Sequence, residues 1–169
     1  ILLVIASPIM LITAVVIKLY DGGPVLYKQI RCTKDQREFS IMKFRSMRTD
    51  AEKDGVARLA QKNDDRITPI GKVIRKCRID ELPQLINILN GTMSIVGPRP
   101  AAVDQVDITR GGENAIAAKV PCGLTSQSSL WDYIYGDQFP DEAEYNEKVL
   151  PIRLKLDVYY VKHASFFGD

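Results

Sequence analysis

Two adjacent carboxylates, Asp80 and Glu81, are the residues of this chain best placed to do chemistry. They open the stretch RIDELPQLINILNG (78–91), in which apolar residues recur at helical spacing until Gly91. Pro83 is tolerated only in the first turn of a helix, so we expect the helix to begin within a residue or two of Asp80. A helix N-terminus favours anions, which leaves two interpretations of Asp80: a cap for the helix, or a reactive carboxylate.

Arginines accompany the carboxylate pair and favour the reactive interpretation. Arg75 and Arg78 precede Asp80, and Arg99 is held in a GPRP turn (97–100) that prolines and glycine make rigid. The planar guanidinium group can bond two phosphate oxygens at once. Because a carboxylate and a phosphate repel each other, such a site needs a metal ion and arginines to neutralise the phosphates. These residues therefore indicate phosphoryl chemistry.

The segment before Lys18, ILLVIASPIMLITAVVI, is apolar on every side. Its 17 residues form a helix of about 25 Å, which is short against a hydrocarbon core of roughly 30 Å. Pro8 removes a backbone donor, so we expect a bend at which the Ser7 hydroxyl satisfies the freed carbonyl. Such a helix can enter and leave a membrane by the same face. The alternatives are a core helix of a soluble protein and a straight spanning helix that begins before Ile1.

The remaining pattern predicts an α/β single domain that is mostly helical and contains a small β-hairpin. Two β-rich runs, 25–31 and 38–45, flank a polar turn. The other expected elements are a weak helix (49–62), a helix capped by Thr68 with Pro69 at its first position, a short strand (92–96), a helix that starts with a capping box of Asp141 and Glu144 and ends near Leu150, and a helix that starts at Pro151. Residues 101–130 give no clear pattern.

Composition limits the classes of protein that fit. With 169 residues, 46 % apolar and 26 % charged, the chain is long and apolar enough to fold as one domain. A net charge of +2 is smaller than that of a usual duplex-DNA-binding protein. The three cysteines, Cys32, Cys77 and Cys122, lack CxxC spacing and indicate a reducing compartment without a disulfide framework or zinc site.

Four segments carry a family resemblance: GPVLYKQIR, FSIMKFRSMRTDAE, DDRITPIGKVIRKCRIDELPQLINILNGTMSIVGPRP and LDVYYVKHASF. They closely resemble the bacterial sugar transferases that begin glycan assembly, the monotopic polyprenyl-phosphate phosphoglycosyl transferases. The resemblance covers about residues 1–100 and returns at about 149–169. The DELPQL and GPRP motifs, at this separation, are highly specific.

The resemblance implies an enzyme that moves a sugar-1-phosphate from a UDP-sugar to polyprenyl (undecaprenyl) phosphate and releases UMP, as the first membrane step of polysaccharide or glycoprotein glycan synthesis. It implies that Asp80 is the nucleophile and carries a covalent phosphosugar intermediate, and that Glu81 ligates Mg²⁺, the expected cofactor. It also implies that Arg75 and Arg99 bind substrate phosphate and that Asp157 lies beside the substrate.

The resemblance further implies a location. Ser7 and Pro8 would break a re-entrant membrane helix (1–20), and residues 21–169 would form a catalytic domain on the cytoplasmic face of a bacterial inner membrane. The expected partners are the UDP-sugar donor, the polyprenyl phosphate acceptor and membrane lipid, and no nucleic acid. Lys43 and Arg45, in the basic segment KFRSMR, contact substrate phosphate or lipid head groups in one interpretation and form a solvated strand end in the other.

One segment departs from the family pattern. Relatives commonly read RPGITGWAQ where this chain has VPCGLTSQ (120–127), so Pro121 takes the arginine position and Cys122 the proline position. The donor sugar therefore stays open, and a catalytically silent membrane scaffold is an alternative function. A helix-turn-helix-like nucleic-acid module over 69–90 is a further alternative, and it would require residues 1–17 to be core.

Overall fold

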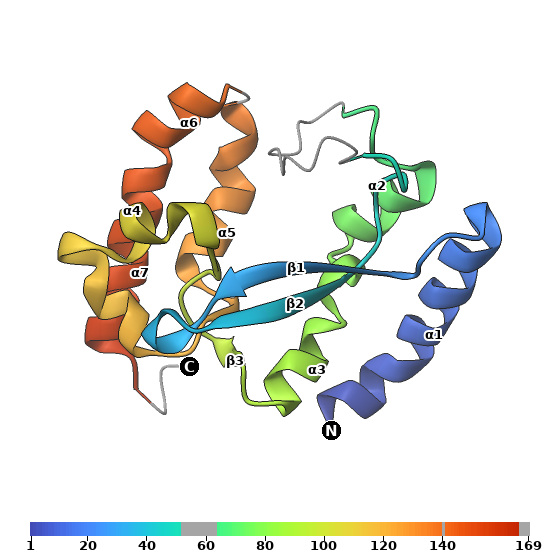
Figure 1. Ribbon diagram of the computed structural model, residues 1–169, viewed down its shortest axis with the longest axis horizontal. Helices are drawn as coiled ribbons and strands as arrows, with labels where there is room; N and C mark the ends of the chain where they lie inside the picture. Colours follow the sequence, from blue (N-terminus) through green and yellow to red (C-terminus); the bar gives the residue numbers. More distant parts are fainter. Residues whose placement is uncertain (52–63, 140, 166–169) are drawn as a thin grey trace. The chain divides into compact units, whose positions relative to one another are not determined.

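The computed structural model describes residues 1–51, 64–139 and 141–165 (Figure 1). These residues form a mostly helical fold with a small amount of sheet, as predicted. By their contacts the residues group into two compact units: the first unit has residues 1–29 and 41–87, and the second unit has residues 30–40 and 88–169. The weak helix expected over 49–62 falls mainly on residues outside the described ranges.

The hairpin predicted from the two β-rich runs is confirmed. It consists of β1 (Leu26–Cys32) and β2 (Glu38–Phe44), joined by a 3₁₀ turn at Lys34–Gln36. The end of β1 also pairs antiparallel with the short strand β4 (Ala101–Ala102), giving a three-stranded sheet in the order β2-β1-β4.

The first unit contains α1 (Leu2–Asp21), α2 (Pro69–Lys76) and α3 (Gln84–Leu89). Its core is a cluster of buried apolar residues from α1, β2 and α2, surrounded by partly buried ones: Ile17, Phe44 and Ile74, with Met10, Ala14, Val25, Ile70 and Ile79. Thr68 caps α2, as predicted, because its Oγ1 accepts the Gly71 N–H at 2.9 Å. A Cβ at Gly71 would lie 1.9 Å from the Ser46 carbonyl oxygen, so only glycine lets the chain after β2 lie this close to α2.

Helix α1 is continuous through Pro8, and the reason is local. The missing N–H of Pro8 leaves the Val4 carbonyl unpaired, and the Ser7 hydroxyl donates to that carbonyl at 2.8 Å. The predicted use of this serine is confirmed. Whether the helix follows a re-entrant path stays a prediction.

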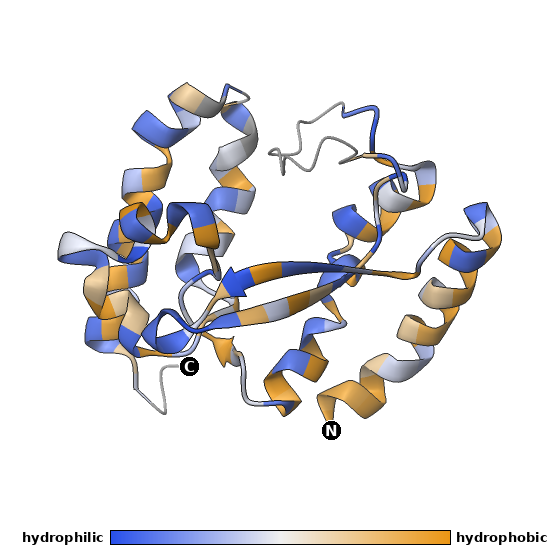
Figure 2. Ribbon diagram, in the orientation of Figure 1, coloured by the Kyte–Doolittle hydropathy of each residue, from blue (hydrophilic) through white to orange (hydrophobic). Residues whose placement is uncertain are grey.

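Most of α1 is exposed apolar surface. Figure 2 shows the helix largely in orange, with pale stretches along it and blue at its C-terminal end. Val4 is 74 % exposed and Leu19 80 %, whereas Thr13 and Ile17 are buried. Among the described residues α1 is long and apolar enough to cross a membrane. The nucleic-acid alternative required this segment to be core, and the structure does not meet that requirement.

The second unit is built around α7 (Leu150–His163), which packs against α5 (Gln127–Tyr135) and α6 (Glu142–Lys148) (Figure 1). Asp141 caps α6 by accepting the Glu144 N–H at 3.0 Å, as the capping box predicted. The strand expected near residue 94 is β3 (Ser94–Val96), and it pairs in parallel with β5 (Gly123–Thr125). The part of the chain without a clear pattern also forms α4 (Val106–Arg110) and a 3₁₀ segment, Gly112–Lys119.

Candidate active site

The expectation that an α-helix begins beside Asp80 is wrong. Residues Ile79–Glu81 form a 3₁₀ turn, and α3 begins only at Gln84. Pro83 has no N–H with which to bond the Ile79 carbonyl four residues back, and the Leu82 N–H bonds that carbonyl instead, at 3.1 Å. Asp80 is therefore not an α-helical N-cap and does not gain the stabilisation that such a position gives an anion.

Arg78 turns the chain between α2 and the 3₁₀ turn. Its backbone is left-handed, with φ 57° and ψ 19°, a conformation that costs a non-glycine residue about 1–3 kcal/mol. Beyond this turn the Asp80 side chain is buried, at 8 % exposure, while Glu81 is partly exposed. The strained turn thus gives two adjacent carboxylates two different environments.

Asp80 is buried without a full set of hydrogen bonds. Its Oδ1 is one of two buried side-chain polar atoms, among the residues that the structure describes, that have no hydrogen-bond partner. Burial raises the pKa of Asp80, the neighbouring Glu81 raises it further, and the charges of Lys43, Arg75 and Arg78 oppose the rise. A buried carboxylate oxygen left unpaired is costly to the fold, which marks Asp80 as a candidate reactive group.

Glu81 is paired where Asp80 is not. Lys43 Nζ donates to Glu81 Oε1 at 2.9 Å, and Arg78 Nη1 lies 3.6 Å from the same oxygen. Arg75 is half-buried, and its Nη1 donates to the Ser46 hydroxyl at 3.5 Å. The first unit therefore gathers a carboxylate pair and several cations. Their binding of phosphate stays a prediction.

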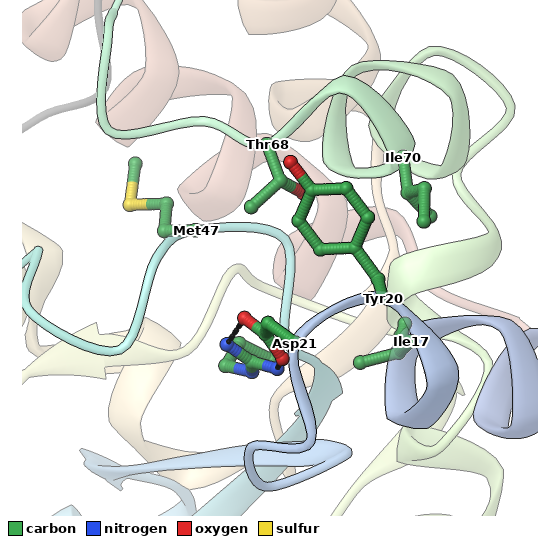
Figure 3. Close-up of a pocket in the computed structure, with 7 residues that line it drawn as sticks. Ile17, Tyr20, Asp21, Met47, Thr68 and Ile70 are labelled. Atoms are coloured by element: carbon green, nitrogen blue, oxygen red, sulfur yellow. Dashed lines mark hydrogen bonds and ion pairs between the residues drawn. The ribbon is translucent and has the colours of Figure 1, made fainter.

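Arg45 has a different environment from Lys43. It is 8 % exposed, its Nε donates to the Pro24 carbonyl at 2.6 Å, and both terminal nitrogens donate to the Asp21 carboxylate (Figure 3). The pair borders a small hollow lined by Ile17, Tyr20, Met47, Thr68 and Ile70. These contacts connect the end of α1 to the chain after β2. Arg45 is therefore buried and ion-paired, and the interpretation of its segment as a solvated strand end is wrong for this residue. Its binding of substrate stays a prediction.

The second unit contains the other two predicted residues. Arg99 is 37 % exposed at its side chain, and its Nη1 lies 4.0 Å from Asp132 Oδ2. Asp132 in turn accepts a hydrogen bond from the Tyr145 hydroxyl at 2.7 Å. Asp157 is 4 % exposed, and burial raises its pKa. Arg99 is thus accessible for binding, whereas Asp157 is enclosed by protein.

Two residues that contact Asp157 had no signal in the sequence. Ser128 donates to Asp157 Oδ1 at 2.5 Å, and Arg110 Nη1 lies 3.6 Å from Oδ2. Both come from the part of the chain whose local pattern gave no clear elements. Local spacing could not have found them, because they meet Asp157 only through the packing of α4 and α5 with their neighbours.

The segment that departs from the family pattern supports the GPRP turn. The Gly123 N–H donates to the Pro98 carbonyl at 2.9 Å, and a Cβ at Gly123 would lie 2.2 Å from the Gly97 nitrogen. The Ser126 hydroxyl then caps α5 by accepting the Ser129 N–H at 2.9 Å. This segment therefore positions backbone beside residues 97–100.

Comparison with known proteins defines the class. The chain belongs to the bacterial sugar transferase family, whose model matches residues 1–169. It is 54 % identical, over 96 % of its length, to a UDP-N-acetylgalactosamine-undecaprenyl-phosphate N-acetylgalactosaminephosphotransferase from Aeromonas hydrophila, of which the match covers 37 %. It is 36 % identical, over 99 % of its length, to a UDP-glucose:undecaprenyl-phosphate glucose-1-phosphate transferase from Escherichia coli strain K12, of which the match covers 35 %.

A shorter relative matches over more of its own length. The exopolysaccharide production protein PSS from Rhizobium leguminosarum bv. phaseoli is 50 % identical over 99 % of this chain and 82 % of its own sequence. The chain thus spans little more than a third of the two longer relatives and most of the shorter one.

Proposed function

We propose that this protein is a membrane-bound phosphoglycosyl transferase that moves a sugar-1-phosphate from a UDP-sugar to undecaprenyl phosphate. The observation that carries the proposal is the Asp80 carboxylate, buried and with an unpartnered oxygen, within the electrostatic influence of Lys43, Arg75 and Arg78. Family membership supports the reaction class, since relatives bear the names of undecaprenyl-phosphate sugar-phosphate transferases.

In the first step, an Asp80 carboxylate oxygen attacks the phosphorus atom that bears the sugar. A new O–P bond forms, the bond from that phosphorus to the bridging oxygen breaks, and UMP leaves with the bridging oxygen and its electron pair. The ionised form of the carboxylate is the one that attacks, so the step itself transfers no proton. Lys43 and Arg75 reduce the repulsion between the carboxylate and the incoming diphosphate.

In the second step, a phosphate oxygen of undecaprenyl phosphate attacks the same phosphorus. The bond to Asp80 breaks, the carboxylate is regenerated, and the product is an undecaprenyl-diphosphate sugar. A covalent intermediate allows UMP to leave before the lipid acceptor binds, so one nucleophile can serve two very different substrates in turn. Arg99 would bind substrate phosphate in these steps, as predicted from its motif.

Mg²⁺ is the proposed cofactor, and the carboxylates present fit it. Glu81 is a hard oxygen ligand beside Asp80, and Mg²⁺ in phosphate sites is commonly held by one or two carboxylates together with substrate phosphates and water. The described residues contain no cluster of three or more histidine, cysteine, aspartate or glutamate ligands. When bound, Mg²⁺ would neutralise charge on the diphosphate.

The membrane location follows from the substrates and from α1. A soluble donor and a lipid-bound acceptor must meet at the membrane surface, and α1 offers exposed apolar side chains such as Val4 and Leu19 for insertion. We propose a re-entrant α1 in a bacterial inner membrane and a catalytic part on the cytoplasmic face. Accessibility labelling of cysteines introduced at the exposed positions 2 and 19 tests this: a re-entrant helix exposes both ends to the same side, whereas a spanning helix exposes them to opposite sides.

The decisive experiment measures UMP release. The purified protein, with Mg²⁺ and undecaprenyl phosphate, is given a panel of UDP-sugars that includes UDP-N-acetylgalactosamine and UDP-glucose, because relatives bear the names of both sugars. At least one donor is expected to release UMP. Asp80→Asn should abolish release, since an amide does not displace UMP, and full turnover by this variant would show that Asp80 is not the nucleophile.

A catalytically silent scaffold is the second candidate, and the altered 120–127 segment is the observation that favours it. Intact-protein mass spectrometry separates the two candidates. A transferase incubated with donor alone accumulates a phosphosugar adduct on Asp80, whereas a scaffold gains no mass and releases no UMP with any donor. Neither outcome depends on knowing the acceptor lipid length.

A further inference from the structure

The contacts of the Asp157 carboxylate leave it little capacity to bind a substrate. Ser128 donates to one of its oxygens at 2.5 Å, and the other lies 3.6 Å from Arg110 Nη1. Asp157 and Arg110 are 4 % and 5 % exposed. Desolvating two charges costs several kcal/mol each, and a buried ion pair is therefore weak evidence for stability by itself. The pair calls for another explanation.

Arg110 and Asp157 both lie against the backbone of Arg99. Arg110 Nη2 donates to the carbonyl of Arg99, and the backbone N–H of Arg99 faces the Asp157 carboxylate closely enough to lower its pKa. The two members of one buried ion pair thus meet both polar backbone groups of one residue. Arg110 Nη1 also donates to the Thr109 carbonyl at 3.0 Å, which fixes the guanidinium to its own helix, α4.

The sequence of the turn explains why Arg99 is the residue held. Prolines occupy positions 98 and 100, and neither has an N–H. Arg99 therefore supplies the backbone donor between the two prolines, and a bond to it fixes the peptide orientation of the whole turn. The Pro98 carbonyl is held separately, by the Gly123 N–H at 2.9 Å. The Arg99 side chain remains partly exposed.

We propose that Arg110 and Asp157 are positioning residues, which clamp the backbone of Arg99 so that its guanidinium is preorganised for a substrate phosphate. The proposal rests on the proposed function and refines it, because it moves Asp157 from the substrate-binding residues to the residues that act through Arg99. A guanidinium on a fixed turn loses less entropy on binding, and its fork keeps the orientation that bidentate phosphate binding requires.

A double-mutant cycle on kcat/KM for the UDP-sugar tests the proposal. Asp157→Asn should lower kcat/KM by about 10–100-fold, the effect of misplacing a substrate-orienting group by about 1 Å. In an Arg99→Ala background the same substitution should change kcat/KM by less than about 3-fold, because the group that it positions is gone. Equal losses in both backgrounds would overturn the proposal. Asp64→Asn, which removes the charge of the buried Asp64 from its pair with the partly exposed Arg66, is the matched control and should be additive with Arg99→Ala.

A paired replacement guards against a variant that fails to fold. Arg110→Met combined with Asp157→Leu removes both charges, and apolar residues commonly replace a buried ion pair without loss of stability. If the pair has only a structural role, this variant regains full activity. If the pair positions Arg99, the variant unfolds at the same temperature as the unchanged protein and still shows the 10–100-fold loss.

Hydrogen exchange tests the clamp without any enzymatic activity. Within residues 97–100, Gly97 and Arg99 have exchangeable amides, and the Gly97 N–H is bonded to the Thr125 carbonyl. Exchange at Arg99 should be about 10-fold or more faster in the paired replacement and unchanged in Asp64→Asn. Unchanged exchange in the paired replacement would overturn the proposal. If the unchanged protein releases no UMP with any donor, the proposed function fails, and the exchange result still decides whether the ion pair fixes Arg99.

Discussion

Asp80→Asn should make the folded protein more stable at the same time as it abolishes activity. The Asp80 carboxylate is 8 % exposed and its Oδ1 has no hydrogen-bond partner. A buried, unsatisfied polar group costs about 1–3 kcal/mol, and more when it is charged. An asparagine of the same shape removes the charge but keeps some unsatisfied polar atoms, so we expect a gain of about 1–2 kcal/mol in the free energy of unfolding at pH 8.

The gain should depend on pH in a direction set by the pKa of Asp80. Burial and Glu81 raise that pKa, so the folded protein binds the proton more tightly than the unfolded chain. The cost of the charge is therefore complete above the folded pKa and absent below the unfolded value of about 3.9. The stability difference between Asp80→Asn and the unchanged protein should be largest at pH 8 and should shrink as the pH falls toward 4.5.

Thermal unfolding in detergent, followed by far-UV circular dichroism, measures this difference. For a chain of this length a gain of 1–2 kcal/mol raises Tm by roughly 2–8 °C. Glu81→Gln is the matched control, because Glu81 is paired with Lys43 at 2.9 Å and its loss should leave Tm unchanged or lower. The reasoning is refuted if Asp80→Asn does not raise Tm at pH 8, or if both substitutions shift Tm equally.

Two further predictions concern the residues that support the site. Asp21→Asn leaves the buried Arg45 guanidinium without its anionic partner and should lower the free energy of unfolding, measured by chemical denaturation, by about 1–3 kcal/mol. The control is Asp50→Asn, at an exposed ion pair, which should change the free energy of unfolding by less than about 0.5 kcal/mol in that assay. Gly123→Ala places a Cβ 2.2 Å from the Gly97 nitrogen, so we expect a loss of at least about 2 kcal/mol and a large fall in UMP release; near-normal values of both would show that the backbone can adjust there.

Several elements were predictable because their causes are local. Thr68 caps α2 and Asp141 caps α6 through hydrogen bonds that span three residues, and the Ser7 hydroxyl bonds the carbonyl that Pro8 leaves unpaired. The β-hairpin follows from two β-rich runs around a polar turn. Each of these features depends on residues close together in the chain, so their spacing carries the information.

The residue types of the candidate site were also visible in the sequence, but their environments were not. Both carboxylates were identified from RIDELP, yet the same sequence suggested a helix N-terminus that the structure replaces with a 3₁₀ turn. Lys43 and Arg45 are alike in sequence context, yet one pairs with Glu81 and the other is enclosed against Asp21. Which charge becomes buried depends on what packs against it, and local spacing does not specify that.

The sequence by itself determined the two carboxylates, the rigid GPRP turn, the apolar first helix and the family of the chain. The tertiary structure alone decided that Asp80 is buried with an unpartnered oxygen and that Arg110, paired with the buried Asp157, binds the backbone carbonyl of Arg99. The physical reason is that hydrogen bonding within a turn is set by neighbouring residues, whereas desolvation and ion pairing between residues tens of positions apart arise only when packing brings them together.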